Sequence, residues 1–432
     1  MYLGSYPMPN VDGASNTFLT DDIILKEALR LLENDLVALR LVNRAAEKQF
    51  GGKYKVGDSV SVKKPYRTKA ASGRILQVQP MVDQSVTMTV DRQSHIALQF
   101  TQTDRTMHIN DFSDRYLKSA VAQLAHQVDY SVLVEAKNTL FNQVGTSGNT
   151  FNDTVGIDAR AKATKLGIPN DGMVKLLLDP LDAAGYRKGL RGLNNGEMVR
   201  NAIERSYLGP ISNMDAFESA QMPSHTVGVA TGTPRAHAGG GALTGSTIST
   251  DGWTNDTTAI LKKGDIISFA GVYSVNPQTY ESTGMQAQFV VTADVNSGAS
   301  TGPASISISP AINDGTLTTV DGEGNTVSLA AYQNVNAAPA DDALITVVGT
   351  GGTTRRENFL LHKDAISVAI VDIEAPESAV VSQRARHDAS GISMLMTAGY
   401  NINDFTQIYR IDILWGVKNW YPELGMRLHG AA

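Results

Sequence analysis

Few side chains of this sequence are spaced for catalysis or for metal binding. The 432 residues include no cysteine, which excludes a thiol nucleophile, a cysteinyl zinc site, an iron–sulfur cluster and a disulfide scaffold. The eight histidines are scattered, and no two stand four residues apart as the ligands of a helical zinc site do. The signatures GxxxxGK(S/T), GxGxxG and GxSxG are absent. We therefore expect no catalytic residue, no metal site and no cofactor.

Two motifs resemble functional sites, and each has a structural interpretation that we favour. His362-Lys363-Asp364 contains an acid beside a base, but it directly precedes an apolar strand, so we expect a structural or capping role. The glycines of 349–352 lack the third glycine of a phosphate-binding fingerprint and the helix that should follow it. We expect a linker there.

Basic side chains gather in one segment that has no helical periodicity. It contains Lys63, Lys64, Arg67 and Lys69, and Arg74 follows shortly after. Such a segment can contact nucleic acid, or it can contact an acidic surface on a neighbouring subunit. The net charge of the chain is -6, and the segment offers a single tyrosine for base stacking. Both facts favour protein contact.

The composition is typical of a folded, multidomain protein. Hydrophobic residues make up 42% and charged residues 19% of the chain, and the length suggests about three domains. The first residues, MYLGSYPMPN, have neither a basic nor an apolar region, so we expect no secretory signal. No apolar run approaches the roughly 18 residues that span a bilayer. We expect a soluble protein, made in the cytoplasm and without a membrane partner.

The elements around the basic segment can be placed from periodicity. Residues 1–20 lack periodicity and predict an extended arm, and residues 21–52 carry leucines at helical spacing and predict a helix. Residues 53–105 alternate apolar with polar side chains, which predicts a long β-arm that contains the basic segment. Within the α/β region 106–223, residues 110–144 predict one helix about 50 Å long.

Residues 224–354 differ in composition from the rest of the chain. They hold 18 of the 39 glycines, and 10 acidic against 3 basic residues, a net charge of about -7. Threonine, serine and valine are frequent, and turn residues recur about every 8–12 positions. This pattern predicts an all-β barrel, and the change of charge at both edges predicts a domain inserted into another fold.

Three motifs near the C-terminus resemble those of tailed-phage major capsid proteins. They are NFLLHKDA at 358–365, RIDILWGV at 410–417 and YPEL at 421–424. Within the inserted region, KGDIISFAGV at 263–272 resembles the inserted barrel of the P-twenty-two branch of that family. The resemblance covers most of the chain, in the same order of elements.

The resemblance implies an α+β coat-protein fold of the Hong Kong ninety-seven type. It implies an N-terminal arm (1–20), an N-terminal helix (21–52) and an E-loop (53–105). The spine helix and part of the P- and A-domains would follow (106–223), then the I-domain barrel (224–354), and the C-terminal strands (355–432) would complete the P- and A-domains. No cleaved N-terminal propeptide is recognisable, which is similar to relatives that use a separate scaffolding protein.

The function implied is that of a structural protein, not an enzyme. Many copies would form hexamers and pentamers of an icosahedral virion shell, assembled in the host cytoplasm with a scaffolding protein and a portal. The packaged double-stranded DNA would be contacted without sequence specificity. An encapsulin-like nanocompartment shell is one alternative. A second is an enzyme or carbohydrate-binding protein whose β-region binds ligand, but we expect the aromatic residues of that region to fill its barrel.

Contacts between subunits are expected at the β-arm and at the inserted domain. An extended arm can overlap a neighbour, and a shell needs many modest contacts that symmetry repeats. The residues predicted to lie at such interfaces are Lys63, Lys64, Arg67, Lys69, Arg74, Asp251 and Asp256.

Overall fold

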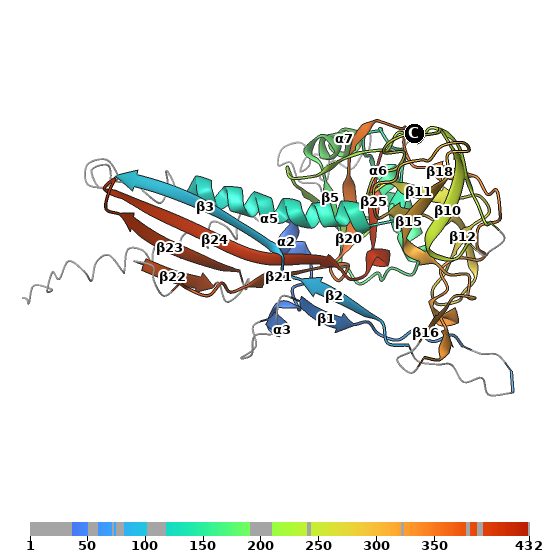
Figure 1. Ribbon diagram of the computed structural model, residues 1–432, viewed down its shortest axis with the longest axis horizontal. Coiled ribbons are helices and arrows are strands. Elements are labelled where there is room, and N and C mark those ends of the chain that lie inside the picture. Colours follow the sequence, from blue (N-terminus) through green and yellow to red (C-terminus); the bar gives the residue numbers. More distant parts are fainter. Residues whose placement is uncertain are drawn as a thin grey trace, which may run out of the picture.

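The computed structural model describes most of the chain and gives an elongated molecule (Figure 1). A long sheet with one helix along it lies at one end, and two compact units lie at the other. The predicted arm 1–20 and the first part of the predicted helix 21–52 lie outside the described residues. Those described are 37–50, 59–70, 73–74, 82–101, 118–190, 210–239, 243–320, 324–376, 381–386 and 392–430.

The long sheet is built around its 14-residue strand β24 (Thr406–Asn419). One edge of β24 pairs with β3 (Arg92–Thr101), and the other edge pairs first with β23 (Ser393–Asn401) and then with β21 (Ile366–Val371). Strand β22 (Val381–Arg386) adds to β23. All these pairs are antiparallel, and β21 is the apolar strand that was expected directly after His362-Lys363-Asp364.

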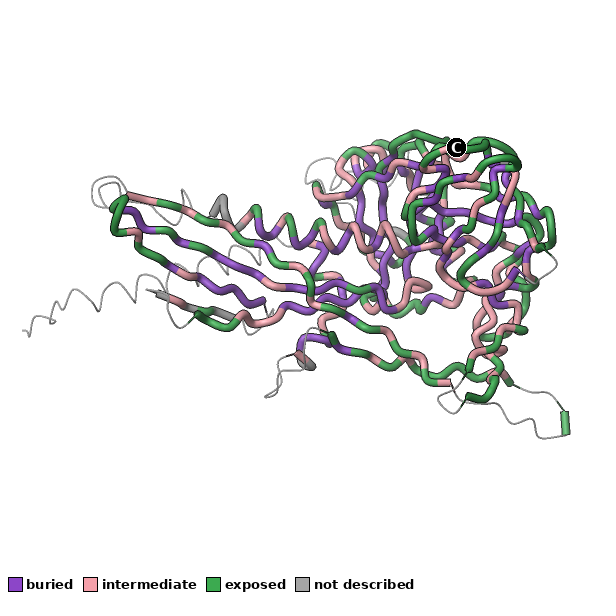
Figure 2. Tube along the Cα trace, viewed as in Figure 1, coloured by how far each residue is buried: buried purple, intermediate pink, exposed green. Residues whose placement is uncertain are grey.

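Helix α5 (Lys118–Thr139) packs along this sheet, within the range predicted for the long helix. The predicted end near residue 144 is wrong: the helix ends at Thr139, because residues 143–144 pair as a strand with residues 427–428. One row of its buried side chains recurs every four residues, which is the spacing of one helix face. The row consists of Leu124, Val128, Val132, Ala136 and, just past the end of the helix, Leu140. Two side chains of β24 bond to the helix: Trp415 Nε1 donates to Ser131 Oγ at 2.9 Å, and Asn419 Nδ2 donates to Thr139 Oγ1 at 2.7 Å. Figure 2 shows the buried positions that line this contact.

The predicted helix over 21–52 is not continuous in its described part. It consists of α2 (Ala38–Leu41) and α3 (Glu47–Phe50), with Asn43 between them in an extended bridge to β21. The Asn43 N–H donates to the Ile366 carbonyl, and the Val368 N–H donates to the Asn43 carbonyl, both at 2.9 Å. The prediction of one helix is wrong here because sheet hydrogen bonds use the backbone groups that a helix would need.

The α/β body combines segments that are far apart in sequence. Its sheet order is β4-β25-β20-β5-β7-β6, and helices α6 and α7 pack against it. The bounds are β4 (Gln143–Val144), α6 (Asp153–Lys165), β5 (Val174–Leu178), α7 (Pro180–Leu190), β6 (Pro210–Ile211), β7 (Met214–Glu218), β20 (Asn358–His362) and β25 (Gly425–Leu428). The last two strands come from beyond the inserted region and complete the sheet.

The inserted region contains a closed antiparallel barrel, as its composition predicted. The strand order is β18-β11-β14-β15-β10-β9, and a bridge between Arg235 and Leu344 joins the two ends of the sheet. The strands are β9 (Gly232–Ala236), β10 (Gly245–Trp253), β11 (Ile266–Phe269), β14 (Phe289–Val291), β15 (Ala304–Ile312) and β18 (Ile345–Val347). Shorter hairpins project from it: β12 (Tyr273–Val275) with β13 (Ser282–Gln286), and β16 (Thr318–Val320) with β17 (Thr326–Ser328).

Only part of the aromatic set expected to fill the barrel does so. Trp253, Phe269 and Phe289 are buried in its core, and the two phenylalanine rings meet edge to face at 5.8 Å. Tyr273 is 40% exposed, and Tyr280 and Tyr332 are partly exposed as well. The expectation is wrong for these three tyrosines, which leaves their hydroxyls available on the barrel surface.

The chain leaves the body for the barrel and returns through a two-stranded ladder. Strand β8 (Ser224–Thr226) pairs antiparallel with β19 (Thr354–Arg356), so that Thr226 lies opposite Thr354. These positions coincide with the edges of the compositional change. All residues from 227 to 353 therefore branch from two neighbouring points of the body.

The region 53–105 divides into two parts. Strands β1 (Ser59–Lys63) and β2 (Ser85–Thr89) form an antiparallel pair that extends from the long sheet, where Met88 packs with Ala369 of β21, toward the β16–β17 hairpin (Figure 1). Strand β3, which the alternation placed in the same arm, instead pairs with β24 along ten residues. Alternation alone identifies a strand, but it does not identify the strand's partner.

Candidate functional site

The basic segment lies where three parts of the molecule meet. It follows β1 and contacts both the barrel and the short 3-10 helix η3 (Pro422–Leu424), which precedes β25. At its start, the Lys64 N–H donates to the Gln84 carbonyl at 2.7 Å. The contacts that fix the rest of the segment involve side chains. We call the residues that receive it the arm-docking cleft: Tyr280, Tyr332, Gln333, Tyr421 and Glu423.

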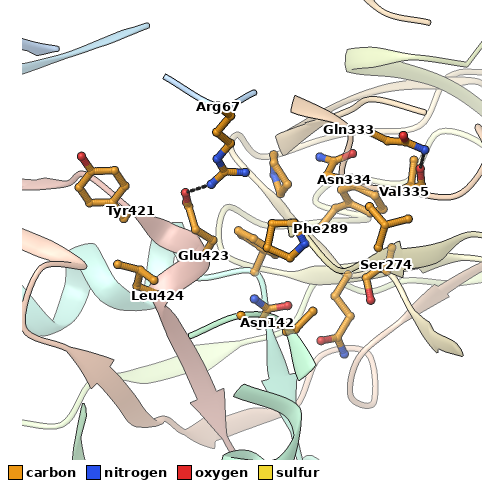
Figure 3. Close-up of a pocket in the computed structure, with 18 residues that line it drawn as sticks. Arg67, Asn142, Ser274, Phe289, Gln333, Asn334, Val335, Tyr421, Glu423 and Leu424 are labelled. Atoms are coloured by element: carbon orange, nitrogen blue, oxygen red, sulfur yellow. Dashed lines mark hydrogen bonds and ion pairs between the residues drawn. The ribbon is translucent and has the colours of Figure 1, made fainter. Parts of the chain in front are cut away.

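One side of the cleft is the C-terminal turn. Arg67 Nη2 donates to Glu423 Oε1 at 2.9 Å, an ion pair in which both side chains are partly exposed (Figure 3). The Lys64 ammonium lies 5.1 Å from the centre of the Tyr421 ring, a cation–π distance. Burial lowers the pKa of Lys64, and Glu423 opposes this shift while the positive Arg67 adds to it.

The other side of the cleft is the barrel surface. The Lys69 ammonium lies 4.8 Å from the centre of the Tyr280 ring and donates to Gln333 Oε1 at 3.2 Å. The Tyr280 hydroxyl lies 2.9 Å from the Ala331 carbonyl and 3.3 Å from the Thr68 carbonyl, both of which are acceptors. The tyrosine thus links the barrel to the arm. Tyr332 makes a longer contact at 3.4 Å, from its hydroxyl to the Val82 carbonyl.

The base of the arm is held across its own hairpin. Lys63 Nζ donates to Asp83 Oδ2 at 2.7 Å, and the Tyr66 hydroxyl donates to Asp83 Oδ1. These two hydrogen bonds lower the pKa of Asp83. Both partners are exposed to water, so the ion pair orders the arm more than it stabilises the fold.

A cavity of about 220 Å³ lies under the arm (Figure 3). Arg67 and Glu423 stand on its arm side, and the barrel and the body line the remainder. The lining includes Asn142, Ser274, Phe289, Val335 and Leu424. Because of this cavity, the arm contacts the barrel and the body through the ends of a few side chains and is not packed against a continuous core.

A buried charge cluster joins the barrel to the body near this point. Arg427, on β25, donates to both oxygens of Glu357, at 2.6 and 2.8 Å, and neither residue is exposed. Arg355 Nε also donates to Glu357, at 3.0 Å. Arg427 further donates from Nη1 to the Gly264 carbonyl in the barrel, at 2.5 Å. A single arginine of β25 thus contacts both Glu357, which lies just after the insertion, and the barrel.

The charges of this cluster shift the pKa values of its acid and its histidine. Burial by itself would raise the pKa of Glu357, but Arg427, His429 and Arg355 outweigh burial and hold that pKa well below its usual range. Burial lowers the pKa of His429 to about 4, although Glu357 opposes the shift. The carboxylate is therefore ionised and the imidazole neutral at pH 7.

A second buried pair fixes the point where the insertion begins. His225 Nε2 and Asp265 Oδ1 are 2.7 Å apart, and both residues are buried. The other oxygen of Asp265 accepts the N–H groups of Gly228 and Lys262, at 3.0 and 2.7 Å. Asp265 belongs to the KGDIISFAGV motif, so the resemblance noted there corresponds to a structural junction.

The structure brings four of the seven predicted interface residues together. Lys63, Lys64, Arg67 and Lys69 line the arm-docking cleft or the base of the arm, and their described contacts are within the chain.

The other three predicted interface residues are separate. Arg74 is exposed further along the arm. Asp251 pairs with His237 at 3.6 Å on the barrel, and Asp256 is exposed in a barrel loop.

The motif His362-Lys363-Asp364 has the structural contacts that were expected of it. His362 Nε2 lies 3.1 Å from Asp171 Oδ2, and the Asp364 N–H donates to His362 Nδ1 at 3.2 Å. Among the described residues, no group of three or more histidine, aspartate or glutamate side chains is arranged to hold a metal ion. None of the helices in those residues combines the length and apolar character that crossing a membrane requires.

Sequence reasoning missed the acceptors of the arm and the buried cluster. Glu423 lies in the YPEL motif, but nothing in the sequence connects it to Arg67, 356 residues away. A signal for the cluster was present: Glu357 adjoins an apolar strand, and Arg427 stands between Met426 and Leu428. A charge within an apolar run predicts a buried partner of opposite sign.

Structural comparison finds phage capsid proteins and a virus-like particle at low similarity. Mycobacterium phage Che8 gives a TM-score of 0.47 at 11% identity, covering 92% of each chain. The capsid of cyanophage P-SCSP1u gives 0.42 at 11% identity, covering 87% of this chain and 84% of that one. The virus-like particle from Pyrococcus furiosus gives 0.40 at 7% identity, covering 94% and 98%. At these scores the likeness does not define a relationship.

Comparison of sequences is decisive. No curated protein matches the chain. The sequence does match the family described as P22 coat protein, gene protein 5, over residues 14–430. This match spans the arm, the long helix, the body and the inserted barrel, and it confirms the resemblance that the C-terminal and barrel motifs suggested. The chain belongs to the P22 coat protein family.

Proposed function

We propose that this chain is the major capsid protein of a tailed phage, which assembles as hexamers and pentamers into an icosahedral shell around double-stranded DNA. The observation that carries the proposal is the family match over residues 14–430. A scaffolding protein directs assembly, a portal occupies one vertex, and assembly takes place in the host cytoplasm. The role is structural, and no bond is made or broken in substrate.

The shape of the subunit supports this role. The projecting β-arm offers a surface that can overlap a neighbour, and the long sheet offers an extended edge. In the coat-fold terms introduced above, the β1–β2 hairpin corresponds to the E-loop, α5 to the spine helix and the barrel to the I-domain. The β21–β24 region and the α/β body correspond to the P- and A-domains.

Charge supports an orientation of the subunit in the shell. The inserted region carries a net charge of about -7, whereas the remainder is close to neutral. Phosphate repels an acidic surface, so the barrel faces outward and the near-neutral remainder faces the DNA. Such an inner surface contacts DNA without sequence specificity and lets it move during packaging.

The interface residues proposed are those predicted from the sequence. Lys63, Arg74 and Asp256 are exposed and can meet a neighbouring subunit directly. Lys64, Arg67 and Lys69 contact the arm-docking cleft of their own chain and thereby position the arm, and Asp251 lies on the barrel.

An encapsulin-like nanocompartment is the second candidate. The inserted barrel and the N-terminal extension count against it, and a family match of this length counts for the coat protein.

The test is to express the chain together with the neighbouring phage genes and to image the product by negative-stain electron microscopy. Uniform icosahedral shells are expected. Discrete small oligomers, with the scaffolding protein shown to be present, would contradict the proposal. Omitting the scaffolding gene is the matched control: regular shells should then be lost. Regular shells that form without it and enclose a cellular protein would favour the nanocompartment.

A further inference from the structure

We propose that the inserted barrel and the C-terminal turn form a clasp that holds the β-arm of the same chain in one direction, in the free subunit and in the shell. The clasp consists of Tyr280 and Gln333 on the barrel and of Tyr421 and Glu423 at the turn. This assigns the barrel a task that neither its fold nor its charge implies.

The contacts are divided between the two sides of the clasp. Lys64 and Arg67 contact the C-terminal turn, at Tyr421 and Glu423, while Lys69 contacts the barrel. The three basic side chains are spaced along an extended segment, so each fixes a different point of it. Three points held from two sides define a direction, whereas any one of them would leave the arm free to rotate.

Each contact is weak when taken alone, and the surroundings explain why. The Arg67–Glu423 pair is partly exposed, and exposed pairs are screened by water and salt. The cavity of about 220 Å³ beneath the arm removes the packing that would otherwise hold it. Direction therefore depends on all the contacts acting together, and the loss of one should misdirect the arm without unfolding the protein.

The clasp also depends on the buried junction below it. Arg427 bonds the barrel through the Gly264 carbonyl, and Asp265 bonds His225 where the insertion begins. These buried contacts fix the barrel to the body, so the barrel half and the turn half of the clasp keep a constant separation. A barrel joined only by its two connecting strands could rotate relative to the body, and it could not hold the arm in one direction.

The consequence for assembly rests on the proposed function, but the clasp itself can be tested in the free subunit. Thr68 and Ala331 are suitable positions for cross-linking, because their carbonyls lie beside the same Tyr280 hydroxyl, at 3.3 and 2.9 Å. The chain contains no cysteine, so Thr68→Cys with Ala331→Cys gives a protein with two thiols only. A short bis-maleimide then reports whether these thiols meet within one chain or between two.

We expect a product of single-chain mass from free subunits and from purified shells alike. Dimers and higher multimers from shells would show that the arm lies on a neighbour and would overturn the proposal. The absence of any single-chain product from free subunits would overturn it as well. Each single-cysteine variant measures collisions between chains and serves as the control.

An exchange of charges tests the other side of the clasp, the Arg67–Glu423 ion pair, which the two cysteines leave in place. In the cross-linking background, Arg67→Glu and Glu423→Arg should each slow the single-chain reaction by about two- to fivefold, the factor that one exposed ion pair supports. The double variant should recover the original rate, because the pair is restored with its signs reversed. A double variant as slow as the single ones would contradict the clasp.

Mixing distinguishes contact within a chain from contact between chains. The two charge variants, Arg67→Glu and Glu423→Arg, are mixed in the cysteine-free chain. If the arm binds the clasp of its own chain, every ion pair in this mixture is mismatched, and shell assembly stays impaired. Recovery of normal shells in the mixture would overturn the proposal. If the unmodified chain forms no shells at all, the proposed function fails, whereas the free-subunit cross-link still decides whether the clasp exists.

Discussion

Arg427 donates a hydrogen bond to each oxygen of Glu357, and both side chains are completely excluded from solvent. A paired charge of this kind is costly to break, because the partner that remains has lost both its counter-charge and its water. Arg355 shares the same carboxylate, so one acid compensates two buried guanidinium groups. The stability of the junction should therefore be most sensitive to that acid.

Removal of the Glu357 charge should strongly destabilise the subunit. We expect Glu357→Gln to lower the free energy of unfolding by about 3–5 kcal/mol, because it leaves two buried arginines without compensation. Urea unfolding followed by circular dichroism measures this loss. Glu281→Gln, on an exposed hairpin, is the control and should change stability by less than about 0.5 kcal/mol. Equal effects of the two substitutions would show that the cluster is not a source of stability.

His429 should make stability depend on pH between about 6.5 and 4. Its pKa is lowered by burial to about 4 in the folded state, so the unfolded chain binds a proton at a higher pH than the folded one. The contribution of His429 to stability is therefore constant above pH 7, falls as the pH drops from 6.5 to 4, and then levels off, by up to about 3 kcal/mol in all.

The pKa of His225 is also lowered, chiefly by burial, and adds in the same direction. The contribution of Glu357, whose pKa is depressed, is lost only below the pKa of an unfolded glutamate. Urea titrations from pH 7.5 to 4.5 should show a smaller slope for His429→Gln than for the unmodified protein. An unchanged slope would refute the assignment.

Asp129 should stabilise the start of α2. This buried carboxylate of α5 accepts the N–H groups of Val37, Ala38 and Leu39, at 2.6, 3.0 and 3.1 Å. Asp129→Ala should cost about 1–2 kcal/mol, the usual range for loss of a helix cap. Asp129→Asn keeps one acceptor oxygen and should cost less. If the asparagine variant is the less stable of the two in thermal unfolding, capping is not the role of this residue.

Charge reversal in the arm should impair assembly without unfolding the subunit. Lys64→Glu and Arg67→Glu replace favourable contacts at Tyr421 and Glu423 with unfavourable ones, and neither Lys64 nor Arg67 belongs to a buried hydrophobic core. Sedimentation and electron microscopy should show fewer or malformed shells. The melting temperature of the free subunits should match that of the unmodified protein. Variants that keep this melting temperature and still form normal shells would contradict the prediction.

Local patterns predicted several elements because their signals are local. The four-residue spacing of Leu124, Val128 and Val132 identifies a helix face wherever the helix lies. Frequent turns and glycine in 224–354 identify short strands, and the change of charge at the edges marks the insertion. The C-terminal motifs indicated the protein family, which no single helix or strand pattern identifies.

The remaining features depend on contacts distant in sequence. Asn43 interrupts a helical pattern because β21, more than 300 residues later, takes up its backbone groups. The basic segment was recognised by its charge, but its acceptors Glu423 and Tyr280 belong to other parts of the chain. Periodicity contains no information about which distant side chain a lysine or an arginine will meet.

The ladder of β8 and β19 has a practical consequence for engineering. Thr226 and Thr354 lie opposite each other in an antiparallel pair, so their Cα atoms are about 5 Å apart. A tight turn of a few residues could close that gap, and a foreign domain with adjacent termini could be spliced in its place as an exchangeable cassette for display. Such a graft must supply an acceptor for the Arg427 guanidinium and a partner for His225, since both reach into the barrel that would be removed.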